Sequence, residues 1–466
     1  MISESIKDKL NDELNETCKE LKIPGMALTV YQNGNSIYNN YYGYRNVDEK
    51  LPVTKDTVFG LASITKSLTC LTIMMLEEEG KLNSTDKVIK WLPNLKWPRE
   101  DYAKQLEIRH LMSHTSGLPG LPSIHNARIR SIRNDPDGEF LFGKWNPDEQ
   151  TIIQTADELI EQISNMEFEL LGPPGKVFNY SNEGFGMLQK IIELASGPPF
   201  IKYVEEKLFF PLDMQDSFFL TESIANKENV TELYAYKEKQ SDVFHSPAWW
   251  DVGDIYTNGS WKTSAEDLMK FVEMLRLNGN FYGKKIISEN MIKKMTSSAF
   301  RLPNGGDYGY GIEINSIGEY TRFGHGGSVK GVSSNFQVIG EKGISASILV
   351  NMADVPAEKI LVSVLNTILE IPAAELFNKS PVLSDKSLDL SNFSGLYKSG
   401  EGNKASVSIQ NNLLYLNRNE LVTCFYPISE NDFIAETGER IYFSRNGDHV
   451  TSVLIGKRVL AKTDEE

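Results

Sequence analysis

Apolar residues at intervals of four near the start of the chain predict an amphipathic helix over residues 4–21. These positions are Ile6, Leu10, Leu14 and Cys18. A strand-like run follows at 26–31, and Asn33-Gly34-Asn35 is a turn signal before a second, aromatic run that ends at Tyr44. Such a short connection predicts an antiparallel hairpin.

Four further segments carry helical periodicity. Residues 63–79 place apolar side chains near one stripe and end at Gly80, and residues 183–196 end at a Gly-Pro-Pro sequence. Residues 265–277 begin after Ser264, a helix-capping residue, and end at an Asn-Gly pair. The last predicted helix covers about 357–369.

Strand character returns between residues 308 and 351, most clearly at 344–350, where small and branched residues alternate. Strands therefore come from both ends of residues 1–375, and most of the helices lie between them. This order predicts an α/β (α+β) fold, in which an antiparallel sheet is flanked by helices and carries a helical insertion.

The pattern changes beyond a linker-like passage at 375–388, which contains Pro381 and several serines. From about 390 to 466, short β runs alternate with Asn and Gly turns, which predicts a small all-β module, either a sandwich or a barrel. We therefore expect two domains, 1–375 and 388–466.

Composition restricts the class of protein further. The 466 residues are 40% hydrophobic and 24% charged, as in soluble globular proteins, and the net charge of −15 argues against nucleic acid or an anionic membrane as partner. No apolar run is long enough to span a membrane, and charges interrupt the N-terminus where a signal peptide needs apolar residues, so we expect a cytoplasmic protein. Three dispersed cysteines suggest neither a disulfide framework nor a Cys-rich zinc site.

A serine and a lysine three residues apart, Ser63 and Lys66, open the helix predicted at 63–79. Residues at this spacing share one helix face, so the amine can reach the hydroxyl. A serine nucleophile needs an adjacent base, and a desolvated lysine can lose its proton and serve as that base. The spacing recurs at Ser84 and Lys87, but that copy lies in a polar stretch.

A second candidate is Tyr180-Ser181-Asn182. A tyrosine near a lysine can carry a proton to a leaving nitrogen, and an Asn side chain can orient a substrate amide. The Y-x-N pattern also occurs at Tyr256, but Tyr180 follows a Gly-Pro-Pro-Gly loop and precedes a helix, which favours it. A third candidate is the glycine-rich run from Gly324 to Ser328, which includes His325 and would let a substrate lie against a strand edge.

In this order, S-x-x-K, Y-x-N and H-x-G resemble the motifs of the β-lactamase-like serine hydrolases, which include class C β-lactamases, penicillin-binding proteins, D-aminopeptidases and related esterases. Residues 108–118 and 261–268 look like family signatures too, and the resemblance covers about residues 20–370. The C-terminal module is similar to the small, lipocalin-like β-barrel of some D-aminopeptidases. The resemblance implies a β-lactamase/transpeptidase-like fold.

The resemblance also implies residue roles. Ser63 would be the acylated nucleophile, Lys66 its base and Tyr180 the proton relay. The substrate would contact Asn182, His325, Gly327 and Ser328, and the oxyanion hole would be the backbone N–H groups of Ser63 and Ser328. No metal or organic cofactor is implied.

His325 stands where many β-lactamases carry a lysine, and a neutral imidazole offers a substrate carboxylate no fixed positive charge. This favours a D-amino-acid peptidase or amidase that acts on a peptide or another small molecule. The alternatives are an esterase or class C-like β-lactamase of the same fold, and a penicillin-binding or sensing protein that is acylated without turnover. Assembly into a homo-oligomer stays open.

Two other features allow two interpretations. His110 and His114 are four residues apart and could bind zinc from one helix face, but no third ligand accompanies them. We expect them to be structural and to hydrogen-bond their own loop. The Trp249-Trp250-Asp251 segment either lines the cleft or forms a packed aromatic corner.

The two S-x-x-K copies generate a direct prediction. Ser63→Ala should abolish labelling by a fluorophosphonate or a fluorescent penicillin, because it removes the nucleophile, and Ser84→Ala should leave labelling intact. Gel fluorescence of the two variants beside the wild-type chain is the measurement. Equal labelling of the Ser63→Ala protein would exclude Ser63 as the nucleophile.

Overall fold

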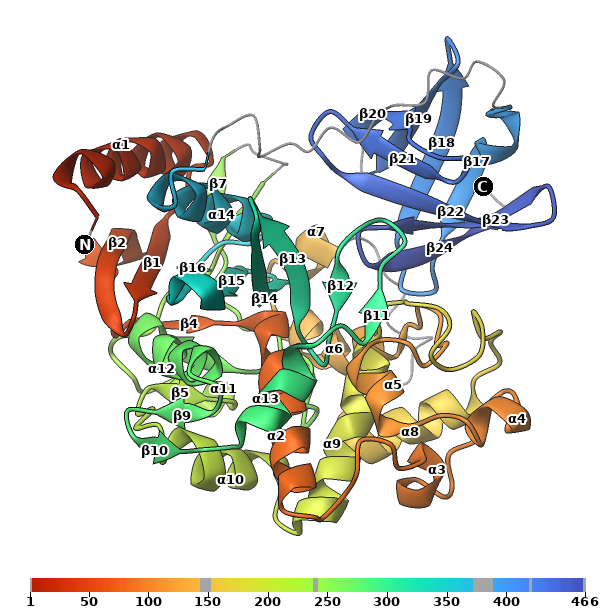
Figure 1. Ribbon diagram of the computed structural model, residues 1–466, viewed down its shortest axis with the longest axis horizontal. Coiled ribbons are helices and arrows are strands. Elements are labelled where there is room, and N and C mark those ends of the chain that lie inside the picture. Colours follow the sequence, from red (N-terminus) through yellow and green to blue (C-terminus); the bar gives the residue numbers. More distant parts are fainter. Residues whose placement is uncertain (1, 143–151, 238–241, 372–388, 419–420, 464–466) are drawn as a thin grey trace.

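The computed structural model of the chain describes residues 2–142, 152–237, 242–371, 389–418 and 421–463. A large sheet between layers of helices forms the main body, and a separate β-barrel follows it (Figure 1). These observations confirm the predicted mixed fold and decide between the two alternatives for the C-terminal module, because its strands close into a barrel. No helix of the described residues is long and apolar enough to cross a membrane.

The sheet has nine strands within the described ranges, and neighbouring strands are antiparallel. Strands from the N-terminus pair with strands from residues 300–350, as predicted, since β1 pairs with β16. In sheet order the strands are β11 (Phe300–Arg301), β12 (Asp307–Tyr308), β13 (Glu313–Ile317), β14 (Tyr320–Val329), β15 (Val332–Ile339), β16 (Ile344–Val350), β1 (Gly25–Gln32), β2 (Asn35–Asn46) and β3 (Leu51–Pro52).

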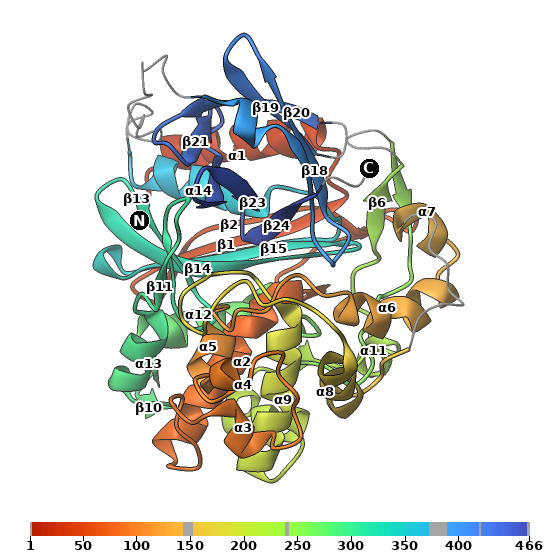
Figure 2. The same cartoon turned by 90° about the vertical axis from the view of Figure 1, so that its right-hand side faces the viewer.

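Alternation of side chains along the central strands builds a core on each face of the sheet. In β1, Met26, Leu28 and Val30 join the core beneath helices α1 (Glu4–Glu20) and α14 (Ala357–Ile368), whereas Ala27 joins the larger core on the other face. Figure 2 shows the sheet between α1 and α14 on one side and most of the remaining helices on the other. Both faces are covered, so β16 is buried along its whole length.

The second face of the sheet carries the helical insertion, and α2 lies at its centre (Figure 1). The predicted helices at 63–79, 183–196, 265–277 and 357–369 correspond to α2, α9, α12 and α14. Between α1 and α14 the helices are α2 (Thr65–Glu78), α3 (Val88–Trp91), α4 (Glu100–Ala103), α5 (Ile108–Met112), α6 (Ser123–Asn134), α7 (Gly138–Phe142), α8 (Ala156–Asn165), α9 (Asn182–Ser196), α10 (Phe200–Val204), α11 (Thr221–Ile224), α12 (Ala265–Arg276) and α13 (Glu289–Thr296).

Small sheets join the helical part together. They pair β4 (Val58–Gly60), β8 (Lys262–Ser264) and β5 (Ser217–Phe218), then β6 (Tyr234–Tyr236) with β7 (Val243–His245), and β9 (Asn280–Phe281) with β10 (Lys284–Lys285). The first of these matters for the site, because β4 leads directly into the segment that carries Ser63.

The barrel closes around an aromatic core that includes Phe393, Tyr397, Phe433 and Phe443. The clearest of the predicted short β runs, at 407–409, 413–416, 441–444 and 450–455, lie in β18, β19, β22 and β23. The strands are β17 (Gly395–Lys398), β18 (Lys404–Gln410), β19 (Leu413–Arg418), β20 (Leu421–Pro427), β21 (Asp432–Ala435), β22 (Arg440–Asn446), β23 (His449–Ile455) and β24 (Arg458–Thr463). The expected boundary at 375–388 lies outside the described residues, so the domain limits stay a prediction.

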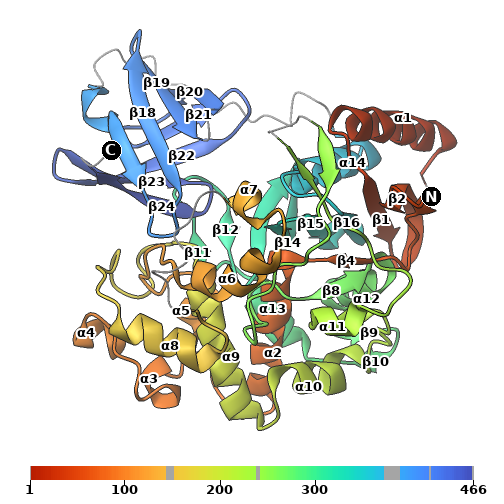
Figure 3. The same cartoon turned by 180° about the vertical axis from the view of Figure 1, so that it is seen from behind.

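The barrel rests on the main body through the turn between β23 and β24 (Figure 3). The backbone N–H of Tyr180 donates to Lys457 O at 2.9 Å, and Val459 N–H donates to Asn179 Oδ1 at 2.9 Å. Asn304 Nδ2 donates to Gly456 O at 2.8 Å in the same turn. Tyr180 was a candidate from sequence, so these contacts bring the barrel to the candidate site.

Candidate active site

Ser63 is a partly exposed residue within a segment that is otherwise buried. Every residue from Thr57 to Leu76 is buried except Ser63, which is partly exposed. Ser63 lies in a 3-10 turn, η1 (Ala62–Ile64), between β4 and α2. Ala62 just before it has a φ of +47°, a conformation that non-glycine residues rarely adopt and that tends to occur at functional sites.

Lys66 is fully buried one turn further along, at 0% exposure. Its Nζ lies 3.1 Å from Ser63 Oγ and 2.6 Å from the backbone oxygen of Asn258. Burial lowers the pKa of Lys66 well below its usual range, and the positive charges of Arg458 and Arg128 lower it further.

A neutral Lys66 amine fits both contacts. The Asn258 carbonyl can only accept, so the amine donates one N–H to it. The lone pair of the neutral amine is then free to take the hydroxyl proton of Ser63. The pair therefore has the geometry and the charge state of a nucleophile with its base.

Tyr180 lies against this pair, in the loop before α9. Its ring centroid is 4.9 Å from Lys66 Nζ. Burial raises the pKa of Tyr180, while the Ser63 side chain acts in the opposite direction, so the phenol stays protonated. The Tyr180 hydroxyl has no hydrogen-bond partner of normal geometry in the described part of the chain, which leaves it available to a reacting group.

Asn182, unlike Tyr180, lies outside the described lining of the cleft. Asn182 is the first residue of α9 and is partly exposed, and it is not among the described residues that line the cleft at Ser63. Its expected contact with the substrate stays a prediction.

His325 lies on β14 at the back of the cleft and is 1% exposed. Its Nδ1 lies 2.6 Å from Gly326 O, so Nδ1 carries the proton, and Nε2 accepts from the Tyr308 hydroxyl at 2.9 Å. Burial and the charge of Lys457 lower the pKa of His325 well below its usual value, so the ring is neutral. Both ring nitrogens are occupied, and neither is free for a substrate carboxylate.

The same strand passes directly beside Ser63 at Gly327. A Cβ atom on Gly327 would lie 2.0 Å from Leu61 O and 2.9 Å from the backbone nitrogen of Ser63, so only glycine fits here. Gly327 and Ser328 line the cleft with Ser63. This approach places the strand edge beside the Ser63 N–H, which is the arrangement that an oxyanion hole needs.

The cleft around Ser63 has a volume of about 530 Å³, and separate parts of the chain form its wall. Ser63 and Tyr180 come from the helical part, and His325 to Ser328 come from β14. Val355 to Lys359 lie before and in α14, and Gly456 to Arg458 come from the barrel. Thus the structure brings Ser63, Tyr180, His325, Gly327 and Ser328 to one cleft, with Lys66 directly behind Ser63.

Sequence reasoning missed the barrel residues at the cleft. Lys457 forms an ion pair with Glu313 of β13, and Arg458 forms one with Glu401 at 2.8 Å. The Arg458 guanidinium also lies 4.7 Å from the ring centroid of Tyr180 and donates to Tyr180 O. In the sequence these residues follow Gly456 in a turn signal between two β runs, and no local pattern shows that the turn faces the cleft.

The rejected copies of the motifs lie elsewhere. Lys87 pairs with Glu107 at 2.7 Å, and the buried hydroxyl of Ser84 has no partner in the described ranges. Tyr256 donates its hydroxyl to Asp254 at 2.6 Å. Asn258, the last residue of the same Y-x-N copy, nevertheless contributes the carbonyl that binds Lys66.

The two histidines of the 108–118 segment differ from each other. His110 Nδ1 accepts from Glu107 N–H at 3.1 Å, within its own loop as expected. His114 Nδ1 instead accepts from Ser181 N–H at 3.0 Å, and its ring centroid is 4.1 Å from that of Tyr180. The expectation of an own-loop bond was therefore wrong for His114, which supports the Tyr180 loop because the two segments meet in the fold.

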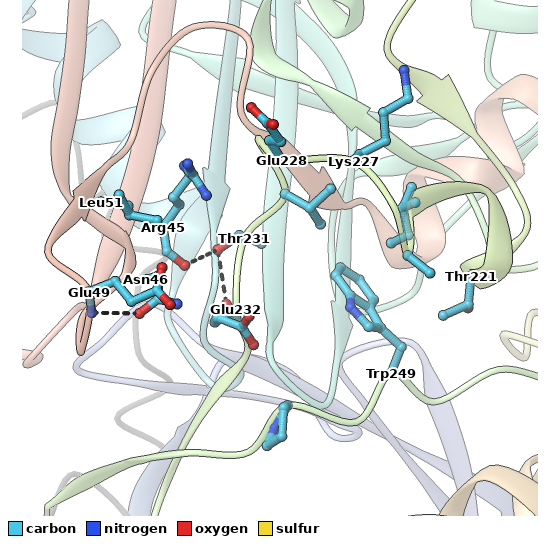
Figure 4. A pocket seen from close by; sticks show the side chains of 14 residues that line it. Arg45, Asn46, Glu49, Leu51, Thr221, Lys227, Glu228, Thr231, Glu232 and Trp249 are labelled. Atoms are coloured by element: carbon cyan, nitrogen blue, oxygen red, sulfur yellow. Dashed lines mark hydrogen bonds between the residues drawn. The ribbon is translucent and has the colours of Figure 1, made fainter.

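Trp249 lines a second cavity, which has a volume of about 600 Å³ (Figure 4). In that view Arg45, Thr231 and Glu232 lie across the cavity from the Trp249 ring. Trp250 donates to Asp135 at 2.7 Å. The described lining of the Ser63 cleft includes neither ring, so the packed aromatic corner describes this segment better.

The chain is similar to known proteins over most of its length. The family model described as Beta-lactamase matches residues 9–362. Penicillin-binding protein 4* of Bacillus subtilis (strain 168) is 26% identical over 418 residues, which cover 86% of each chain. The octameric penicillin-binding protein homologue from Pyrococcus abyssi superposes with a TM-score of 0.70 at 28% identity, over 98% of this chain and 99% of that one.

A further structural neighbour shares the fold of the main body. The D-amino acid amidase from Ochrobactrum anthropi SV3 superposes with a TM-score of 0.60 at 22% identity, over 79% of this chain and 98% of the amidase.

The close approach of β14 to Ser63 generates a prediction with a matched control. Gly327→Ala should lower kcat by about 10²–10³, the effect of losing an oxyanion-hole donor, because the methyl group must push the strand away from the Ser63 N–H. At Gly326 the nearest atom to an added Cβ is the Asn335 side-chain nitrogen at 3.1 Å, which can shift, so Gly326→Ala should lose less than about tenfold. Steady-state kinetics of both variants test this, and equal losses would contradict it.

Proposed function

The chain belongs to the Beta-lactamase family, and on that basis we propose that it hydrolyses an amide or ester bond through an acyl intermediate on Ser63. The observation that carries the proposal is the buried Lys66 amine, 3.1 Å from Ser63 Oγ, with a pKa held well below its usual range. A serine hydroxyl beside a neutral amine has a base within hydrogen-bond reach, as nucleophilic catalysis requires.

In the acylation step, Ser63 Oγ attacks the carbonyl carbon of the substrate while Lys66 Nζ accepts the hydroxyl proton. The backbone N–H groups of Ser63 and Ser328 stabilise the resulting oxyanion. The C–N or C–O bond then breaks, and the Tyr180 hydroxyl delivers a proton to the leaving group and regains one from Lys66. The Tyr180 hydroxyl fits this role because it is buried, protonated and without a competing partner.

In the deacylation step, a water molecule attacks the acyl carbon and gives its proton to the same relay of Tyr180 and Lys66. The bond between the acyl carbon and Ser63 Oγ then breaks, and Oγ regains its proton. The product is a carboxylic acid, and the enzyme returns to its starting state. No cofactor takes part in either step.

The substrate that we propose is a D-amino-acid amide or a small peptide with a D-residue. His325 supports this choice, because its nitrogens are bonded to Tyr308 and Gly326 and leave no cation at position 325 of β14 for the carboxylate of a β-lactam. The likeness to a D-amino acid amidase is consistent with the choice. The octameric state of the Pyrococcus abyssi homologue supports a homo-oligomer here too.

One assay separates the candidate activities. The panel consists of D- and L-amino-acid amides, p-nitrophenyl esters and a chromogenic cephalosporin, with Ser63→Ala as the control for every substrate. We expect repeated turnover that depends on Ser63 and is fastest for D-amides. A single burst without turnover would favour a penicillin-binding protein, and fastest hydrolysis of the cephalosporin would favour a β-lactamase.

The proton relay predicts an order among four variants. Lys66→Ala and Tyr180→Phe should each lower kcat by about 10²–10⁴, because each removes a positioned acid–base group. Tyr256→Phe should change kcat little, because its hydroxyl pairs with Asp254 away from Ser63. The Lys66→Ala/Tyr180→Phe double variant should be hardly slower than the poorer single variant, because both act in one relay.

Measurement of kcat for the four variants on the best panel substrate gives the answer. If Tyr256→Phe lowers kcat strongly and Tyr180→Phe leaves kcat near the wild-type value, the relay uses Tyr256 and not Tyr180. Fully additive losses in the double variant would exclude a shared relay.

A further inference from the structure

The turn between β23 and β24 holds the catalytic loop from outside the main body. Tyr180 uses both of its backbone polar groups in this contact, since its N–H donates to Lys457 O at 2.9 Å and its C=O accepts from Arg458. Asn179, the residue before it, accepts from Val459 N–H at 2.9 Å. Three successive barrel residues therefore set the position of the loop that carries the Tyr180 phenol.

The same turn brings a fixed positive charge to the site. Arg458 lies 4.7 Å from the ring centroid of Tyr180, and Lys66 Nζ lies 4.9 Å from that centroid, so the guanidinium and the amine lie against one ring. Glu401 of the barrel pairs with Arg458 at 2.8 Å, and its side chain is only 6% exposed. A buried carboxylate in this position fixes the guanidinium beside Tyr180.

We propose that Arg458 is a positioning residue for the acylation step, through which the barrel holds Tyr180 in place and supplies the fixed cation that position 325 of β14 lacks. This inference rests on the proposed function. Like charges in a poorly solvated site repel strongly, so Arg458 favours the neutral form of Lys66 without touching the substrate. His325, the titratable residue among those of β14 that line the cleft, has a pKa lowered by burial and cannot do this.

Other titratable groups lie around Lys66, and their effects on its pKa differ in direction. Arg128 of α6 lowers the pKa of Lys66 together with Arg458, whereas Glu183 of α9 and Cys70 of α2 raise it. His114 and His325 are both kept neutral by burial. Glu401 has a pKa raised to about 7 by burial, so its negative charge is incomplete near neutral pH and offsets Arg458 only in part.

The experiment measures the pH dependence of kcat/KM on p-nitrophenyl acetate, a substrate without a carboxylate. The acid limb of this profile reports the deprotonation of Lys66 in the free enzyme. Loss of the Arg458 charge raises the pKa of Lys66, so a higher pH is needed to form the base. We expect Arg458→Gln to move the acid limb upward by about one pH unit, with a roughly tenfold loss of kcat/KM on the limb. Glutamine can still donate to Tyr180 O, so this variant removes the charge more than the contact.

Three variants complete the design. Arg458→Lys keeps the charge and should keep the limb near its wild-type position. Arg458→Met is neutral, retains an apolar stem over Tyr180 and gives the same test if the Gln variant is unstable. Arg445→Gln is the matched control, because Arg445 also lies 4.7 Å from an aromatic centroid, that of Phe393, within the barrel core. This control should leave the limb where it is.

The outcomes are distinct. An unchanged limb in the neutral variants, an equal shift in Arg458→Lys or an equal shift in Arg445→Gln would each overturn the inference. A rise in KM restricted to carboxylate-bearing substrates, with no change in the limb, would identify Arg458 as a substrate contact and overturn it too. Absence of Ser63-dependent hydrolysis in the wild-type chain would overturn the proposed function as well. If the enzyme is active but the acid limb of its pH profile does not move when Arg458 is neutralised, only this inference is overturned.

Discussion

The burial of the Lys66 amine is the constraint on which the rest of the site depends. An ammonium shielded from water is destabilised unless a carboxylate pairs with it, and in the described part of the chain the contacts of Lys66 Nζ are to a hydroxyl, a carbonyl and two aromatic rings. Burial therefore lowers the pKa of Lys66 well below its usual range, and the first helical turn of α2 places the amine beside Ser63. Buried residues on both sides of Ser63 keep this turn rigid, so the nucleophile and its base meet without rearrangement.

The site is assembled from segments far apart in the chain, and each one is held by a different contact. The nucleophile follows a short strand, β4, which pairs with β8. The Tyr180 loop is fixed by His114 on one side and by the barrel on the other. The β14 edge reaches Ser63 because glycine at 327 allows the strand to approach within contact distance. The barrel also forms part of the cleft, because its turn between β23 and β24 supplies part of the wall.

Much of this could be predicted from the sequence, because local patterns report local structure. Periodicity identified α1, α2, α9, α12 and α14, and the order of strands and helices predicted the mixed fold. The sequence motifs alone point to Ser63, Lys66, Tyr180 and His325, and all four lie at or directly behind one cleft. These predictions depend on neighbours within a few positions in the chain.

Contacts between distant segments could not be predicted in this way. His114 was expected to bond its own loop, yet it bonds Ser181, 67 positions along the chain, because the fold brings the two segments together. Arg458 carried no signal, since nothing in a short turn of a β module shows which surface it will face. The occupied nitrogens of His325 depend on Tyr308, a residue with no motif of its own.

The covalent intermediate is the central claim, and mass spectrometry of the quenched enzyme tests it most directly. The chain would be mixed with a D-amino-acid ester, quenched in acid within the first turnovers, digested and mapped. The account predicts an adduct with the mass of the acyl group on the peptide that contains Ser63, and its disappearance when the substrate is exhausted. Turnover without any acylated peptide, or an adduct on a different residue, would contradict it.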